Sequence, residues 1–334
     1  FAPFTSPDSR TWLPALLCAA GVAVVWHLVR TRGEGGARGL VRGVFAPALW
    51  AHRSSRLDLQ ILLFRRSLVA LWASAGLGLT FGVAVGLVRA LDRWVGVPTA
   101  PEVPIALLSA GYTLALFVAW DLSRYALHRL MHEIPTLWEF HQVHHSAEVL
   151  TPLTFHRVHP VESALYELRG VLVGGVLGGL AYWVWRGSAA EWTIFGVHAV
   201  GLGFNALSGN LRHSHVWLRF GPTVERWLLS PAQHQLHHAA DSRSHGCNYG
   251  TWLACWDRAS GSLQVAGPEA PAAFGIRPED RNHGDDLLSA MIGPLRAAGA
   301  RLSRPLAAGL FWAAGGAAAR AEEPLAEEEE APAY

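Results

Sequence analysis

The chain has 334 residues, little charge and no lysine, since all 27 of its basic residues are arginines. Charged residues make up 16% of the sequence and apolar residues 51%, which is too little charge to solvate an ordinary water-soluble protein of this size. The arginines form no basic patch with interleaved aromatic residues, so we expect no nucleic-acid partner. The three cysteines lack CxxC spacing, which argues against a disulfide framework or a zinc ribbon. This composition favours a protein embedded in a membrane.

Several motifs of soluble enzymes are also missing. The sequence contains no HExxH motif, which argues against a zinc peptidase, and no dinucleotide fingerprint, CxxCH or flavin motif. A redox reaction would therefore need a separate electron donor. The first apolar stretch is long and has no basic leader, so we do not expect a cleavable signal peptide.

Five apolar stretches are long enough, or nearly so, to cross a membrane as helices of about 20 residues. They cover residues 12–29, 67–88, 104–122, 170–185 and 192–211. The last two are separated by a short turn and read as a helical hairpin. The sequence therefore predicts an all-α, polytopic membrane protein with about four to five transmembrane helices and a cytoplasmic helical cap.

Arginine bias sets the expected orientation. The segment between the first two apolar stretches contains Arg30, Arg32, Arg38, Arg42, Arg53, Arg56, Arg65 and Arg66. Such loops stay on the cytoplasmic side. Alternation then places residues 123–169 and everything after 211 in the cytoplasm. Because a lysine-free chain is typical of a GC-rich bacterial genome, we expect a multi-pass protein of the bacterial inner membrane.

We divide the chain into a membrane-embedded domain, 1–263, and a C-terminal region, 264–334. The C-terminal region should contain a loop, an amphipathic helix at 285–296 and an acidic tail. The apolar run 305–319 is expected to be an interfacial helix or a weak sixth membrane segment. Glycines repeat every fourth residue at Gly82/Gly86, Gly174/Gly178 and Gly175/Gly179, which favours close helix packing, within the chain or in a homodimer or larger assembly.

The histidines are clustered. Thirteen of the 17 fall within 128–159 and 213–245. Three motifs, HRLMH, HQVHH and HQLHH, place histidines three and four residues apart, on one face of a helix. The candidate metal ligands are His128, His132, His141, His144, His145, His234, His237 and His238, with His213, His215 or both from the RHSH sequence.

This number of imidazoles exceeds what one ion uses, because zinc takes at most four ligands in proteins. The sequence therefore predicts two metal ions. Imidazole suits zinc, copper, iron and nickel, so the ligand type does not identify the metal. His159, Asp121 and Asp241 are candidates to orient the ligand imidazoles, as are Glu133, Glu139, Glu148 and Glu162.

The order HxxxH, HxxHH, HxxHH resembles the fatty acid hydroxylase/sterol desaturase superfamily, over about residues 50–263. Matching flanks are LWEFHQVHHS at 137–146, HPVE at 159–162, SPAQHQLHH at 230–238 and NYGTWLACWD at 248–257. The last flank is similar to a bacterial branch that includes relatives of alkylglycerol monooxygenase. Two departures, residues 257–262 and Cys247, concern substrate fit and local packing more than metal binding.

The resemblance implies a di-iron centre, in which zinc can replace iron, and O₂ as co-substrate. It implies hydroxylation or desaturation of a membrane lipid, such as a sterol, fatty acyl chain, ether lipid or carotenoid. It also implies a separate ferredoxin, cytochrome or reductase as electron donor. One further ligand precedes the last motif: spacing from Gly221 favours His213, whereas counting back from His234 leaves His215 open. The alternatives are a non-catalytic membrane subunit that retains the fold and metal site, and a metal-binding or transport protein.

Overall fold

The computed structural model describes residues 12–32, 36–99, 101–186, 190–194, 197–241 and 246–303. In these ranges the protein is helical apart from two paired strands of two residues each, which confirms the all-α prediction. The run 305–319 and the acidic tail lie outside the described residues.

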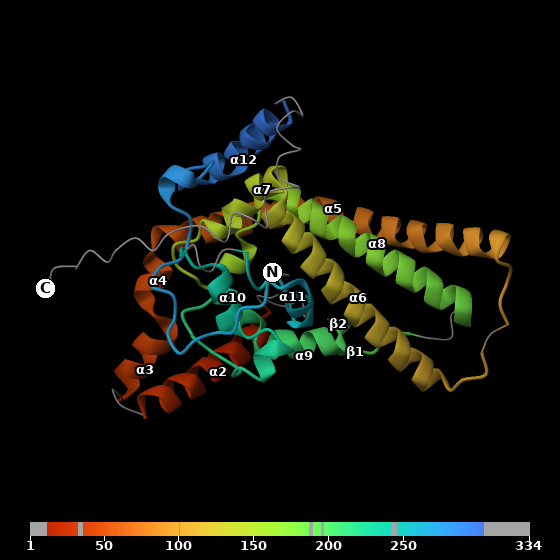
Figure 1. Ribbon diagram of the computed structural model, residues 1–334, viewed down its shortest axis with the longest axis horizontal. Helices are drawn as coiled ribbons and strands as arrows, with labels where there is room; N and C mark the ends of the chain where they lie inside the picture. The colour runs from red at the N-terminus through yellow and green to blue at the C-terminus, as the bar shows by residue number, and fades with distance from the viewer. Residues whose placement is uncertain are drawn as a thin grey trace, which may run out of the picture.

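Three long helices project from a more compact body (Figure 1). They are α5 (Arg53–Trp94), α6 (Ile105–Glu133) and α8 (Pro160–Trp185). In the described residues, α6, α8 and α2 (Leu13–Thr31) are long and apolar enough to cross a membrane. The second expected segment, 67–88, lies inside α5. The chain is therefore a membrane protein.

Local sequence fixes where α8 begins and ends. Pro160 occupies its first turn, where the missing N–H costs nothing, and the His159 side chain accepts a hydrogen bond from Val161 N–H. At the other end Arg186 adopts a left-handed conformation with φ of 54°. Arg186 then pairs with Asp92 of α5 at 2.6 Å, which joins the far ends of the two helices.

Glycines let α8 pack closely against α5. A Cβ atom at Gly175 would lie 2.7 Å from Cβ of Val83, and one at Gly179 would lie 3.0 Å from the carbonyl oxygen of Ala84. A larger side chain at either position would push the helices apart. In contrast, a Cβ at Gly82 would meet nothing within 4 Å among the described residues. Close packing therefore depends on the Gly175/Gly179 pair.

The predicted fifth membrane helix, 192–211, is wrong. The segment contains β1 (Thr193–Ile194), β2 (Val197–His198), α9 (Ala199–Leu207) and the 3-10 turn η2 (Gly209–Leu211). Nine helical residues span about 14 Å, roughly half of the hydrocarbon core. The strand pair precedes α9, and Ser208 and Gly209 follow it. The main chain before the strands bonds to α6 instead: Trp192 N–H donates to Thr113 Oγ1 at 2.8 Å.

The compact body contains the remaining elements. They are α3 (Gly36–Phe45), α4 (Pro47–Ala51), α7 (Pro135–His145), η1 (Thr154–His156), η3 (Val224–Arg226), α10 (Pro231–His237), α11 (Cys255–Ser260), η5 (Pro278–Asp280) and α12 (Leu287–Leu302). The amphipathic helix predicted at 285–296 corresponds to α12, which packs on α7. Its Met291 joins a buried cluster with Leu57 and Val143.

Candidate metal centre

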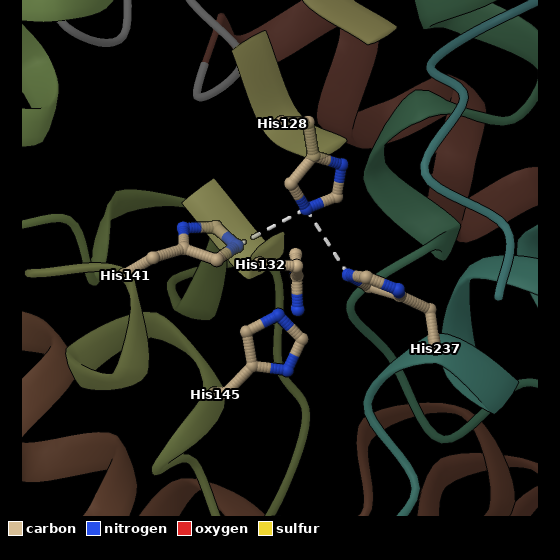
Figure 2. Close-up of side chains that lie close together, drawn as sticks. All are labelled: His128, His132, His141, His145 and His237. Carbon is tan, nitrogen blue, oxygen red and sulfur yellow. Dashed lines mark hydrogen bonds between the residues drawn. The ribbon is translucent and has the colours of Figure 1, made fainter. Parts of the chain in front are cut away.

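The three histidine motifs meet where α6 ends and where α7 and α10 lie. Their rings form two groups, in each of which the nearest ring nitrogens all lie within 4.8 Å of one another. The first group contains His128, His132, His141, His145 and His237, whose rings face a common centre in Figure 2. The second group contains His144, His213, His234 and His238.

Helical spacing explains how each HxxHH motif serves both groups. In α7, His141 and His145 are four residues apart and share a face, while His144 points to the second group. In α10 the pattern is reversed, with His234 and His238 in the second group and His237 in the first. The rings of His145 and His238 stack with centroids 4.4 Å apart, so the two groups are direct neighbours.

The outer nitrogens of several rings are fixed by acceptors. His128 Nδ1 donates to the carbonyl of Tyr249 and His237 Nδ1 to that of Cys247, each at 2.7 Å. A carbonyl only accepts, so Nδ1 holds the proton and Nε2 presents a lone pair. Nε2 of His128 nevertheless lies 3.1 Å from Nε2 of His237 (Figure 2). Two facing lone pairs repel unless a cation lies between them.

The separations have the size expected for shared ligation. In the second group, Nε2 of His213 lies 3.2 Å from Nε2 of His144 and 3.0 Å from Nε2 of His234. Two imidazole nitrogens bound to one ion at about 2.1 Å are about 3.0–3.4 Å apart in octahedral or tetrahedral arrangements. The donor atoms in both groups therefore fit a bound metal ion.

Burial keeps these imidazoles neutral, as metal binding requires. It lowers the pKa of His141 to about 3 and that of His144 to about 4. Burial, reinforced by neighbouring imidazoles, also lowers the pKa values of His145, His234, His237 and His238 well below 6.5. At neutral pH, the lone pairs are free to bind a cation.

Among the acids of the described residues, Glu162 forms a hydrogen bond with a clustered histidine. Its Oε1 accepts from His141 Nδ1 at 2.9 Å, and both side chains are buried. Glu162 is one of several acids that the sequence predicts as candidates to orient a ligand imidazole. The backbone carbonyls of Arg157, Cys247 and Tyr249 were not foreseen, because a carbonyl acceptor has no signature in a sequence.

Nine of the ten predicted histidines belong to the two groups, and His215 does not. Nε2 of His215 donates to the carbonyl of Gly43 at 2.7 Å. His159 donates from Nε2 to the carbonyl of Met291, so it ties α8 to α12. The sequence leaves open whether His213 or His215 is the ligand, and in the structure His213 lies among the clustered imidazoles whereas His215 does not.

The two aspartates among the predicted acids differ in position. Asp121 is fully buried, and its carboxylate accepts from the backbone N–H groups of Trp252 and Leu253 and from Trp256 Nε1. It anchors the loop that follows Tyr249. Asp241 is exposed at the end of the described range 197–241. Asp121 thus supports the site through a loop.

A cavity of about 510 Å³ opens onto both histidine groups. His128 and His141 line it from the first group, and His144, His213 and His234 line it from the second. Aromatic and arginine side chains complete its wall. A substrate in this cavity would reach both candidate metal positions.

Comparisons with known proteins agree with this geometry. The sequence profile of the family "Fatty acid hydroxylase" matches residues 113–262, which include all nine clustered histidines. Alkylglycerol monooxygenase of Homo sapiens is 30% identical over 149 residues, which are 45% of this chain and 30% of that protein. The ornithine lipid hydroxylase OlsE of Rhizobium tropici is 28% identical over 214 residues. That alignment covers 61% of this chain and 55% of the relative.

A third relative is cholesterol 25-hydroxylase of Mus musculus, 26% identical over 194 residues, with 56% of this chain and 59% of that protein covered. The chain thus spans between about a third and three-fifths of these relatives. No solved structure matches the chain. These relatives share a type of reaction and differ in the lipid their names specify.

Proposed function

We propose that the chain is an O₂-dependent membrane oxygenase that hydroxylates or desaturates a lipid, on the basis that the family "Fatty acid hydroxylase" matches residues 113–262. The main support is the facing Nε2 lone pairs of His128, His141 and His237 in the first group, together with the convergence of four ring nitrogens in the second. Such an arrangement is unfavourable without cations and suits two neighbouring metal ions.

We propose iron as the metal at both positions, with zinc as a substitute. The first ion would be held by His128, His132, His141, His145 and His237, and the second by His144, His213, His234 and His238. When bound, the irons would supply O₂ reduction and cleavage of a lipid C–H bond. The choice of iron over another imidazole-binding metal rests on the resemblance of the three histidine motifs to the fatty acid hydroxylase/sterol desaturase superfamily.

The protein's own residues would orient these ligands and admit the substrate. Glu162 and the backbone carbonyls fix the proton on Nδ1 of four histidines, so Nε2 of each of these stays directed inwards: His128, His141, His144 and His237. Buried packing limits access to bulk water, and the cavity gives a lipid access to both positions. Outer acceptors of this kind typically change metal affinity by about 10–100-fold.

The proposal includes the cellular setting. The centre would face the cytoplasm of a bacterial inner membrane, and a separate ferredoxin, cytochrome or reductase would supply electrons. The arginine-rich segment near 53–66 packs beside the histidine motifs, as in the pair Arg157–Asp58 at 3.0 Å. The protein would act alone, as a homodimer or within a larger membrane assembly.

Metal analysis combined with lipid mass spectrometry tests this function. Freshly purified protein should contain two irons per chain, one for each histidine group. Cells that express it under ¹⁸O₂ should accumulate a lipid with one added ¹⁸O, for hydroxylation, or one that has lost two hydrogens, for desaturation.

The variant to compare with the wild-type protein is His144→Ala, which removes one second-group histidine. It should abolish the product while the protein still accumulates in the membrane. The proposal would be contradicted if the purified wild-type protein contained no metal. It would also be contradicted if wild-type and variant cells had identical lipids. Identical lipids together with bound metal would favour a non-catalytic subunit.

A further inference from the structure

The cavity beside the histidines is rich in arginine, which is unexpected for a site that would bind only a neutral hydrocarbon. Arg65 and Arg66 of α5, Arg124 of α6 and Arg212 all line it. Two acids, Glu162 and Glu167, line it as well. The lining side chains therefore have an excess of positive charge before any metal is counted.

Arg212 is the most informative of these residues. Its side chain is 4% exposed, and neither Nε nor Nη2 has a hydrogen-bond partner among the described residues. An arginine guanidinium stays protonated in proteins and only donates hydrogen bonds. Buried donors without hydrogen-bond partners are costly, and native structures normally satisfy them. The Asp121 carboxylate attracts Arg212, but it already accepts from Trp252, Leu253 and Trp256. Arg212 therefore has donors available to a ligand in the cavity that it lines.

Two further arginines extend the same feature. Nε of Arg65 is also buried without a partner in the described part of the chain. Arg124 lies one helical turn before His128, and its guanidinium packs over the ring of Tyr166 at 4.8 Å. Guanidinium groups bind carboxylate and phosphate oxygens with two parallel hydrogen bonds. The cluster therefore suits an oxyanion.

The position of the cluster indicates where that oxyanion comes from. Arg65 and Arg66 directly precede the apolar stretch 67–88 of α5, the place where a helix enters the membrane. Phe155, Trp120 and Trp252 supply an aromatic part of the same wall. A ligand with a charged group and an apolar chain would match both surfaces.

We propose that this cavity binds the head group of an anionic lipid, with its carboxylate or phosphate held by Arg212, Arg124 and Arg65. This inference names a substrate class and rests on the proposed oxygenase function. The lipid would present its charged end to the arginines beside the histidine groups, while its apolar chain extends towards the bilayer. A neutral lipid would leave the Arg212 donors unpaired.

Lipid binding to the full chain in detergent micelles tests this inference. Native mass spectrometry would compare dioleoyl phosphatidic acid and N-oleoylglycine with dioleoylglycerol, which has the same acyl chains as the former and no charge. Each charge-assisted hydrogen bond is worth enough for about a tenfold preference. We expect the anionic lipids to bind at least that much more tightly. Arg212→Gln should remove the preference, and Arg212→Lys should retain part of it.

Matched variants and a free anion complete the test. Arg226→Gln changes an exposed arginine outside the cavity and should leave the preference intact. If Arg212→Gln does not fold, Arg65→Gln on α5 should reduce the preference. Equal binding of dioleoylglycerol would overturn the inference. So would displacement of phosphatidic acid by equimolar inorganic phosphate, which would indicate a site for a free anion.

Iron content and turnover measured on the same samples separate the two proposals. A head-group preference in protein that binds no iron and forms no product would reject the oxygenase and keep the anion-binding cavity. Product formation with equal binding of charged and neutral lipids would reject the head-group site alone.

Discussion

At the scale of single residues, the partners that a histidine side chain reaches decide its role. His213 and His215 are two positions apart, yet one faces three clustered imidazoles and the other donates to a carbonyl of α3. Their side chains therefore contact different parts of the molecule, the metal centre and α3. A pattern such as RHSH does not contain this information.

Replacing each of these histidines separately should give different results. We expect His213→Ala to bind the second ion more weakly and to lose up to about one metal ion per chain on purification, because it removes one of four second-group imidazoles. His215→Ala is the matched control and should retain the full metal content. Inductively coupled plasma mass spectrometry gives the ratio. Equal metal loss in both variants would show that His213 is not a ligand.

At the scale of elements, buried polar contacts hold the histidine-bearing segments in place. Arg157 donates to Asp58 of α5, to Ser146 after α7 and to the carbonyl of Val143, while its own carbonyl accepts from His144 Nδ1. Both members of the Arg157–Asp58 pair are buried. This pair therefore connects the second histidine group to the base of α5.

The α5–α8 contact gives a prediction for glycine substitutions. Gly175→Ala should lower the unfolding temperature, because its new Cβ would lie 2.7 Å from Cβ of Val83; overpacking of this kind costs about 1–3 kcal/mol. Gly82→Ala should raise the temperature or leave it unchanged, since nothing described lies within 4 Å and alanine favours helix by about 1 kcal/mol. Thermal unfolding in detergent compares them. A more stable Gly175→Ala protein would contradict the observed helix packing.

At the scale of the whole molecule, the fold brings together segments about a hundred residues apart and encloses them. The two HxxHH motifs come from α7 and α10, and α12 covers α7 through Glu139, which accepts from Asn282 and Arg301. Eight of the nine clustered histidines are consequently buried and His132 is partly buried, although most polar groups of this kind are found at surfaces. This burial makes stability depend on pH.

Metal-free protein should become less stable as the pH falls below about 6.5. In the folded state, burial keeps the pKa of His141 near 3 and that of His144 near 4, whereas in the unfolded chain both histidines bind protons near pH 6.5. The unfolded state therefore binds more protons between these values, and the free energy of unfolding decreases with acidification. Unfolding temperatures of chelator-treated protein at pH 8 to pH 5 measure this.

The double variant His141→Gln/His144→Gln should show a weaker pH dependence, since two of the titrating groups are gone. An unfolding temperature of the metal-free wild-type protein that is constant over this range would mean that the clustered histidines are protonated in the folded state.

The sequence by itself determined the helical class, the membrane character and the histidine motifs, because hydropathy and the 3.6-residue period are local properties of a chain. It overestimated the helix at 192–211, where hydropathy is high but two paired strands and a hydrogen bond to Thr113 take the place of the first helical turns. Only the tertiary structure divided the histidines into two groups, separated His213 from His215 and placed Arg212 in the cavity. These outcomes depend on which distant segments pack together, and residue spacing along one helix does not encode that.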